Sequence, residues 1–471
     1  MFRPLLPLIR RLHFYAGILI APFVLVAAIS GGLYALAPTA EQIVYRHLLH
    51  TDSAGPPQTI AAQLASVRDR HLGAVVTGVE PAAGGSETTR VYLADDRVGE
   101  WERRTVFVDP QTTEVLGDSV TYGSAGALPL RTWIGGLHRN LHLGEPGRVY
   151  SETAASWLWV VALGGLTLWI NRFRTKRRNT GAPWWRIGVI DRRGTSRSRT
   201  LSRHGAVGVW LVVGLVFLSA TGLTWSHYAG DNIAKLRTEL SWQRPDLPTS
   251  LPTGSHHGTH GTAAPPAGIP TLADDQFDEV LGIARRHGLD GRVEIAVPTD
   301  PSSAVTVTQT RQPWRYSVDS LAIDPHTMQV SAELPFSSWS IPAKLTDWAI
   351  QLHMGILFGW ASALALLTLA VLLVVVIVHG YLMWWRRGTG NHPGRAPARG
   401  TWRTAARSAS PASRAAFVTL MVGTIVVGWF VPLLGIPLLA FLILDAVIGR
   451  RSPTDQPHNR DQSRQRLPAR R

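Results

Sequence analysis

The sequence predicts a mainly α-helical polytopic membrane protein, with a four-helix transmembrane core, a C-terminal helical hairpin and two small α+β extracytoplasmic modules. Three observations lead to this fold class: long apolar runs without acidic or basic residues, arginine-rich segments beside them, and landmarks that recur in both halves of the chain. The apolar residues gather into these runs instead of spreading as they do in a soluble core, so the runs decide the class.

Long apolar runs mark the expected transmembrane helices. A helix needs about 20 apolar residues to cross roughly 30 Å of hydrocarbon. Four runs without Asp, Glu, Lys or Arg meet this need, and they cover residues 12–37, 153–170, 204–228 and 355–385. The first run is longer than the apolar core of a signal peptide and no A-x-A cleavage site follows it, so we expect a retained anchor.

The expected organisation alternates spans with polar segments. Breaks at Pro432, Gly435 and Pro437 divide the last apolar region into two short helices. Spans are expected at 1–38, 153–171, 204–228 and 353–385, with extracytoplasmic modules at 39–152 and 229–352, a flexible linker at 251–269, basic loops at 172–203 and 386–414, a transmembrane hairpin at 415–449 and a disordered tail at 450–471.

The charge pattern predicts the orientation. The formal net charge is +15, and arginine concentrates in the loops 172–203 and 386–414 and in the tail after residue 450. Cytoplasmic segments of membrane proteins are enriched in Lys and Arg. We therefore expect these segments and both termini in the cytoplasm of a bacterial cell, with the chain in the plasma membrane. The same pattern gives no support to nucleic-acid binding.

The chain contains no cysteine. This excludes structural disulfides, thiolate zinc sites, iron–sulfur clusters and thioether-attached haem. Any redox metal must therefore use His, Met, Tyr or carboxylate ligands.

An internal repeat relates the two halves. The segment 106–112 (VFVDPQT) resembles 321–327 (LAIDPHT), each a short strand pattern that ends in an Asp-Pro turn. The segment 141–144 (LHLG) resembles 352–355 (LHMG), and both precede apolar spans that end in tryptophan and arginine. Each module is expected to contain one helix, near 60–71 or 274–287, followed by strands.

Histidines are expected at the ends of the spans. His13 and His204 lie at the predicted cytoplasmic ends, and His142 and His353 at the outer ends. Along single spans, His204 to His227 is about 34 Å and His353 to His379 about 39 Å at 1.5 Å per residue. Ionisable groups in a membrane are costly, so the pattern suggests two functional tiers.

Two neutral imidazoles can occupy the axial positions of a haem iron, a ligation open to a protein without cysteine. The repeat pairs equivalent positions, so we expect His13 with His204 at an inner haem b and His142 with His353 at an outer one. His379 is an alternative at the inner site, and His138 or His227 at the outer site. The group of His256, His257 and His260 in the linker could bind a metal, although a solvated cluster is the simpler interpretation.

Several motifs resemble the PepSY-associated transmembrane helix family. They are His13 with Gly17, the LHLG and LHMG segments, the stretch 219–226 (SATGLTWS) and the stretch 380–387 (GYLMWWRR). The Asp-Pro units look like PepSY modules. The resemblance covers about residues 1–390, and the C-terminal hairpin and tail lie outside it.

That family includes inner-membrane ferric-siderophore reductases in which span histidines hold haems. The resemblance therefore implies a membrane haem oxidoreductase that takes electrons from a cytoplasmic or quinol donor and reduces an extracytoplasmic ferric chelate. The matching positions are His13, His142, His204 and His353. A different class is also open: a non-catalytic membrane protein whose outer modules bind or restrain a protease or a cell-wall partner.

Overall fold

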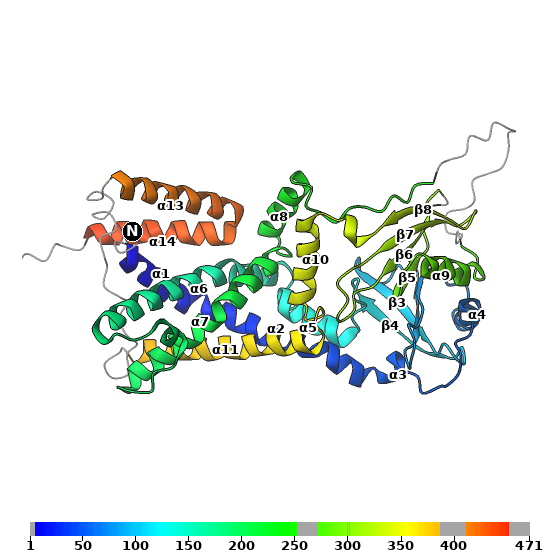
Figure 1. The fold of residues 1–471 in the computed structure, drawn as a ribbon, viewed down its shortest axis with the longest axis horizontal. Helices are drawn as coiled ribbons and strands as arrows, with labels where there is room; N and C mark the ends of the chain where they lie inside the picture. The colour runs from blue at the N-terminus through cyan, green and yellow to red at the C-terminus, as the bar shows by residue number, and fades with distance from the viewer. Residues whose placement is uncertain (1–4, 252–271, 299, 301, 387–410, 452–471) are drawn as a thin grey trace, which may run out of the picture.

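The computed structural model describes residues 5–251, 272–298, 300, 302–386 and 411–451. This part of the chain is mostly helical, and four of its helices are long and apolar enough to cross a membrane. They are α2 (Ala21–Val44), α6 (Glu145–Thr180), α7 (Ser196–Leu223) and α11 (Trp360–Trp385). Figure 1 shows them as a bundle with the strands beyond one end. The chain is a membrane protein, as its apolar runs predict.

The first apolar run is divided between two helices. α1 (Leu6–Leu19) ends before Ile20, and α2 begins with Pro22 in its first turn. Proline lacks the N–H that would continue the hydrogen bonds of α1, whereas the first turn of a helix does not need that donor. The run therefore bends at this point instead of forming one straight span.

The fourth predicted span begins later than the sequence suggests. A separate helix, α10 (Ile341–His353), precedes α11. Between them, Gly355 follows the end of α10 with a φ of +76°, and Gly359, the N-cap of α11, has a φ of +52°. Glycine adopts such positive φ angles without strain. The expectation that His353 opens a span is wrong, because His353 is the last residue of α10.

The second and third spans need similar corrections. α5 (Pro129–Asn140) ends in a turn where His142 has a φ of +55°, and α6 begins only at Glu145. α7 ends at Leu223, and His227 is the N-cap of the next helix, α8 (Tyr228–Glu239). The helix-rise distances from His204 to His227 and from His353 to His379 therefore do not apply, because neither pair shares one helix.

The strands of both halves form a single antiparallel sheet. Their order is β4-β3-β2-β1-β5-β6-β7-β8, so two four-stranded meanders join where β1 pairs with β5. A Cβ on Gly78 would lie 2.7 Å from the carbonyl oxygen of Ile295, so the close approach at this seam requires glycine. The strands are β1 (Val76–Glu80), β2 (Thr89–Leu93), β3 (Glu102–Val108), β4 (Val115–Tyr122), β5 (Val293–Ala296), β6 (Val305–Gln309), β7 (Ser320–Asp324) and β8 (Gln329–Leu334).

Two helices cover one face of this sheet, one from each half. α4 (Ile60–Arg70) and α9 (Gln276–Arg286) share with the strands one core of buried residues, mainly Val, Ile and Leu with Phe277. The carboxylate of Asp278 on α9 accepts hydrogen bonds from the backbone N–H groups of Ile60 and Ala61 at 2.9 and 3.2 Å. The sequence suggests two separate modules, and the structure joins their strands and helices around one core.

The predicted Asp-Pro turns are present at equivalent places. Asp109 follows β3, and its carboxylate accepts hydrogen bonds from the hydroxyl groups of Thr51 and Ser53, both at 2.6 Å, and from the N–H of Gln111 at 2.8 Å. Burial alone would raise the pKa of Asp109, but these hydrogen bonds lower it to about 2. Asp324 ends β7 and accepts from the N–H of His326 in the same manner.

The C-terminal region forms the expected helical hairpin, α13 (Pro411–Phe430) and α14 (Pro432–Arg451). It packs on the bundle through the indole N–H of Trp157, which donates to the carbonyl of Leu433 at 3.1 Å. Arg11 on α1 and Asp445 on α14 form a buried ion pair. Short helices complete the described structure: α3 (Arg46–Leu49), η2 (Trp184–Gly188) and η3 (Phe336–Ser338).

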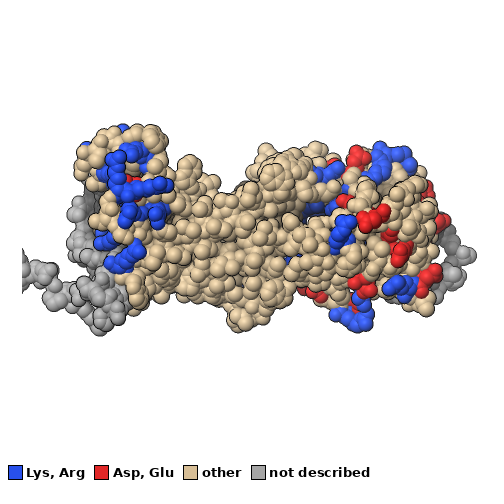
Figure 2. Space-filling view, turned by 90° about the horizontal axis from the view of Figure 1, so that it is seen from below, with Lys and Arg blue, Asp and Glu red and all other residues tan. Residues whose placement is uncertain are grey.

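The charged residues divide the molecule along its length. Figure 2 shows Lys and Arg gathered at the end of the bundle away from the sheet, few charges over its middle, and charges of both signs over the sheet. We call these two ends the basic end and the sheet end. Trp184 in η2 lies at the basic end beneath Arg174 and Arg177, at 5.8 and 5.1 Å from its ring.

We expect Asp278→Ala to lower the melting temperature of the purified protein. A side chain that accepts from the first N–H groups of a helix contributes about 1 kcal/mol to stability. This one also ties α9 to α4, so its loss weakens the contact between the halves. Thermal unfolding in detergent measures the effect. Glu279→Ala, an exposed carboxylate in the same helical turn, is the control, and equal melting temperatures for the two variants would contradict the assignment.

We also expect stability to fall at acid pH through Asp109. The pKa of an aspartate in an unfolded chain is about 3.9, and that of Asp109 is lowered to about 2 in the folded chain. A lowered folded pKa stabilises the folded state above the unfolded pKa, and this stabilisation is lost as pH falls from about 4 to about 2. The difference in melting temperature between the natural chain and Asp109→Asn should narrow across this range. A constant difference would show that Asp109 is not the group responsible.

Candidate functional site

Two histidines lie side by side at the basic end of the bundle. His13 on α1 and His204 on α7 have ring centroids 6.3 Å apart, with an angle of 74° between the ring planes. Both side chains are half-buried among apolar helices. The structure therefore brings together the two residues that the repeat pairs at this end.

Each ring of this pair is held by a later, membrane-spanning helix of its own half of the chain. Nδ1 of His13 lies 3.0 Å from the carbonyl oxygen of Val161 on α6, and Nδ1 of His204 lies 2.9 Å from that of Val376 on α11. A Cβ on Gly165 would lie 2.9 Å from Cε1 of His13, so the ring packs directly on this part of α6. A carbonyl oxygen only accepts hydrogen bonds, so Nδ1 carries the proton and Nε2 keeps its lone pair.

His379, the alternative at this end, is bound within its own helix. Its Nδ1 lies 2.7 Å from the carbonyl oxygen of Val375, one turn earlier in α11. It is a half-buried neighbour of His204. His379 therefore adds a third imidazole near the pair without taking the place of His13 or His204.

At the sheet end, His138 and His353 are held in the same way, each by a hydroxyl group of another helix, whereas His142 is not. Nδ1 of His138 on α5 lies 2.9 Å from the hydroxyl oxygen of Ser30 on α2, and Nδ1 of His353 on α10 lies 2.6 Å from that of Thr221 on α7. Both rings are half-buried, and His138 lies close enough to His353 to contribute to its electrostatic environment. His138, one of the alternatives from the sequence, is therefore the histidine of α5 that we compare with His353.

His142 lies in the turn that follows α5. Its ring is exposed and stacks on that of Trp133 with 5.1 Å between centroids, and its Nε2 contacts the carbonyl oxygen of Trp133 at 2.9 Å. His227, the other alternative, packs its ring against Tyr228 at 4.8 Å. The linker histidines 256, 257 and 260 lie outside the described residues.

The repeat explains why His138 is the equivalent of His353. The residues that contact the two pairs recur at fixed offsets. His204 and Thr221 follow His13 and Ser30 by about 190 positions in each case. His353 and Val376 follow His138 and Val161 by another shift that is common to both. That shift also relates Asp109 to Asp324. By the same shift, the residue of the second half that is equivalent to His142 is Leu357, not a histidine. The LHLG and LHMG match is displaced from this register by one helical turn.

The geometry of the basic-end pair fits a metal held between two imidazoles. A metal–imidazole bond is about 2 Å long, so the centroids of two rings on opposite sides of one metal lie roughly 6 Å apart. His13 and His204 have this separation. Within the described residues, no hydrogen bond engages Nε2 of the four paired histidines, and no group of three or more His, Asp or Glu could hold a metal ion. The basic-end pair therefore has the ring separation that axial ligation of a haem iron requires.

The two pairs lie at different levels of the bundle. His204 lies on α7, and Thr221, which contacts His353, follows it on the same helix by about five turns, or roughly 25 Å at 1.5 Å per residue. Most of the thickness of a hydrocarbon core, about 30 Å, lies between them.

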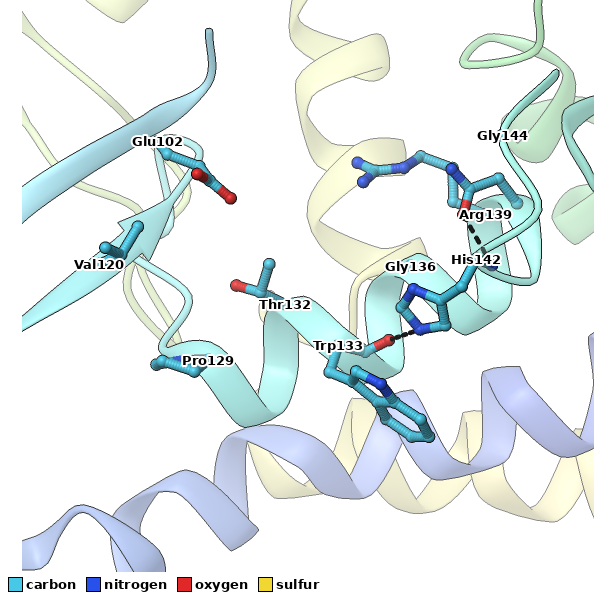
Figure 3. Close-up of a pocket in the computed structure, with 10 residues that line it drawn as sticks. Glu102, Val120, Pro129, Thr132, Trp133, Gly136, Arg139, His142 and Gly144 are labelled. Carbon is cyan, nitrogen blue, oxygen red and sulfur yellow. Dashed lines mark hydrogen bonds between the residues drawn. The ribbon is translucent and has the colours of Figure 1, made fainter. Parts of the chain in front are cut away.

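A cavity of about 460 Å³ lies at the sheet end, between α5 and the edge of the sheet. Figure 3 shows Glu102 on the sheet side and Thr132, Trp133, Arg139 and His142 on the side of α5. The guanidinium of Arg139 donates to the phenol oxygen of Tyr122. This volume suits a small ligand. This cavity could not be predicted from the sequence, because its residues come from strands and a helix that only the fold brings together.

Comparison with curated proteins finds no match to this chain. The profile of the PepSY-associated TM region matches residues 10–387, which include both histidine pairs and the whole sheet. The match ends before the C-terminal hairpin. Since this match covers most of the chain, the protein belongs to the PepSY-associated TM region family.

Proposed function

We propose that the protein is a transmembrane haem b oxidoreductase that passes electrons across the membrane to an extracytoplasmic acceptor, most simply a ferric chelate. The observation that carries this proposal is the recurrence of one arrangement: two imidazoles from different helices, each fixed through Nδ1, at both ends of one apolar bundle. A haem bound at each pair would supply one-electron redox chemistry.

The residues of the chain would prepare these sites before the cofactor binds. The acceptors of Nδ1 set the tautomer in which Nε2 is free, and they hold each ring against rotation. The surrounding helices are apolar, so they exclude water from the bundle. The two pairs would then hold iron at two levels of the membrane.

The direction of electron flow follows from the charge pattern. The basic end corresponds to the arginine-rich segments, which the positive-inside rule assigns to the cytoplasm. The donor, a quinol or a cytoplasmic reductant, would then act at His13 and His204, and the acceptor at His138 and His353. Each electron that leaves the donor would reduce one ferric ion of the chelate to a ferrous ion. The lower charge weakens binding by hard oxygen ligands and so loosens the chelate.

The cavity at the sheet end is the candidate docking site for the acceptor. One face of α5 lines the cavity with Thr132, Gly136 and Arg139. The side chain of His138 extends from another face of this helix and contacts Ser30. One helix therefore separates the cavity from the sheet-end pair. Arg139 supplies a positive charge and Trp133 an exposed ring, which suit an anionic chelate with apolar parts.

A non-catalytic function is favoured by a different observation. The strands β4 and β8 each pair with only one neighbour in the described sheet. Such edges can accept an added strand from another protein. The sheet could thereby bind or restrain an extracytoplasmic protease or a cell-wall partner, with no cofactor in the bundle.

The visible absorption spectrum of the purified protein separates these functions. We expect a Soret band, b-type bands after reduction by dithionite, and about two haem equivalents per chain. A colourless preparation that is fully folded would support the non-catalytic function instead.

Histidine variants test which residues form the sheet-end site. His138→Ala and His353→Ala should each remove about one haem equivalent, because each takes away one axial ligand. His142→Ala is the matched control, since it changes a histidine four residues from His138 that stacks on Trp133, and it should keep both equivalents. Equal haem contents in the His138 and His142 variants would refute the assignment of this pair.

A further inference from the structure

The two ends of the bundle hold their histidines with different kinds of acceptor. At the basic end, Nδ1 of His13 and of His204 meets a backbone carbonyl oxygen. At the sheet end, Nδ1 of His138 and of His353 meets a side-chain hydroxyl, from Ser30 and from Thr221. Ser30 and Thr221 occupy equivalent positions of the repeat, so the difference is built into both halves.

Toward the imidazole rings, both hydroxyl groups act as hydrogen-bond acceptors. The hydroxyl of Ser30 donates to the carbonyl of Val26 at 2.8 Å, and that of Thr221 donates to the carbonyl of Phe217 at 2.7 Å. A hydroxyl has one proton, which these bonds use, so its oxygen accepts from the imidazole N–H. Both sheet-end rings therefore carry their proton on Nδ1 and keep Nε2 free for a metal.

The contact of Thr221 is the stronger of the two. It is 2.6 Å long, whereas that of Ser30 is 2.9 Å. The carbonyl of Ala27, to which Ser30 also donates at 3.2 Å, is a second acceptor near Nδ1 of His138. Loss of the Thr221 hydroxyl should therefore affect its imidazole more than loss of the Ser30 hydroxyl.

An acceptor at the distal nitrogen of a ligating histidine raises the electron-donating power of the other nitrogen and fixes the ring. A stronger donor stabilises the oxidised, more highly charged iron. We propose that Ser30 and Thr221 are positioning residues of the sheet-end site, and that their hydroxyl groups lower the reduction potential of the iron bound there. This inference rests on the proposed haem function.

The basic-end site has no corresponding side chain. Its acceptors are main-chain carbonyls, which a substitution of one side chain does not remove. The potential at the sheet end can therefore be set by residue choice at two positions, independently of the other site. The electron acceptor would be reduced by the haem iron whose reduction potential these hydroxyl groups adjust.

Potentiometry with visible absorption tests this role on the purified full-length chain. Thr221→Val removes the acceptor and keeps the shape of the side chain. At a fixed applied potential, one of the two haem components is expected to change its ratio of oxidised to reduced form about tenfold in favour of the reduced form. This change equals a rise of about 59 mV in the reduction potential of a one-electron couple. The other component should stay unchanged, and Thr221→Ser should restore the original value.

Thr167→Val is the matched control. The hydroxyl of Thr167 on α6 donates to the carbonyl of Leu163 at 2.8 Å, the same type of bond within a membrane-spanning helix, but no hydrogen bond of the described residues joins this half-buried side chain to a histidine. It should leave both components unchanged. Ser30→Ala supplies a second variant should Thr221→Val fail to fold, with a smaller shift of the same sign.

The outcomes separate this inference from the function on which it rests. Unchanged potentials in Thr221→Val and Ser30→Ala, with both haems retained, would overturn the role of the hydroxyl groups and leave the haem function intact. Equal shifts of both components would overturn it as well. Loss of one haem equivalent in Thr221→Val, restored by Thr221→Ser, supports a positioning role. Absence of haem from the natural chain would instead overturn the proposed function itself.

Discussion

An imidazole among apolar helices needs a partner for its N–H, because a buried polar group without one costs about 1–3 kcal/mol. In this protein each of the four paired histidines finds that partner on a different helix: α1 bonds to α6, α7 to α11, α5 to α2 and α10 to α7. These contacts fix how the helices lie along one another. They also determine which nitrogen remains free, so the packing of the bundle and the chemistry of its two ends depend on the same bonds.

The sequence predicts the parts of the fold that depend on local pattern. Hydropathy identifies the four long apolar helices and the hairpin, and the Asp-Pro pattern identifies the turns at Asp109 and Asp324. The sequence does not predict the single sheet, because the pairing of β1 with β5 joins segments about 200 residues apart. The residue pattern of either strand does not specify which strand it pairs with. The break before α11 is also hidden, since Gly355 and Gly359 lie in an otherwise apolar run.

The candidate site shows the same division. His13 and His204 can be paired from sequence because the helices that carry them match without gaps. At the other end, the dipeptide Leu-His occurs twice within one turn, at residues 137–138 and 141–142, and the following glycine favours the wrong copy. The register shared by Asp109, Asp324 and the first residues of α6 and α11 selects His138. Only the side-chain contacts of Ser30 and Thr221 then show how the rings are held.

The seam between β1 and β5 also limits how the protein can move. The halves of the chain repeat in the same direction, as in carriers whose two halves rock to open a central site alternately to each side of the membrane. Such a cycle requires the halves to part at one end and then at the other. Here a continuous sheet and one shared core join the two halves at the sheet end. A rocking carrier would have to break that strand pairing in every cycle. Electron transfer between two sites at fixed positions would not require the halves to separate.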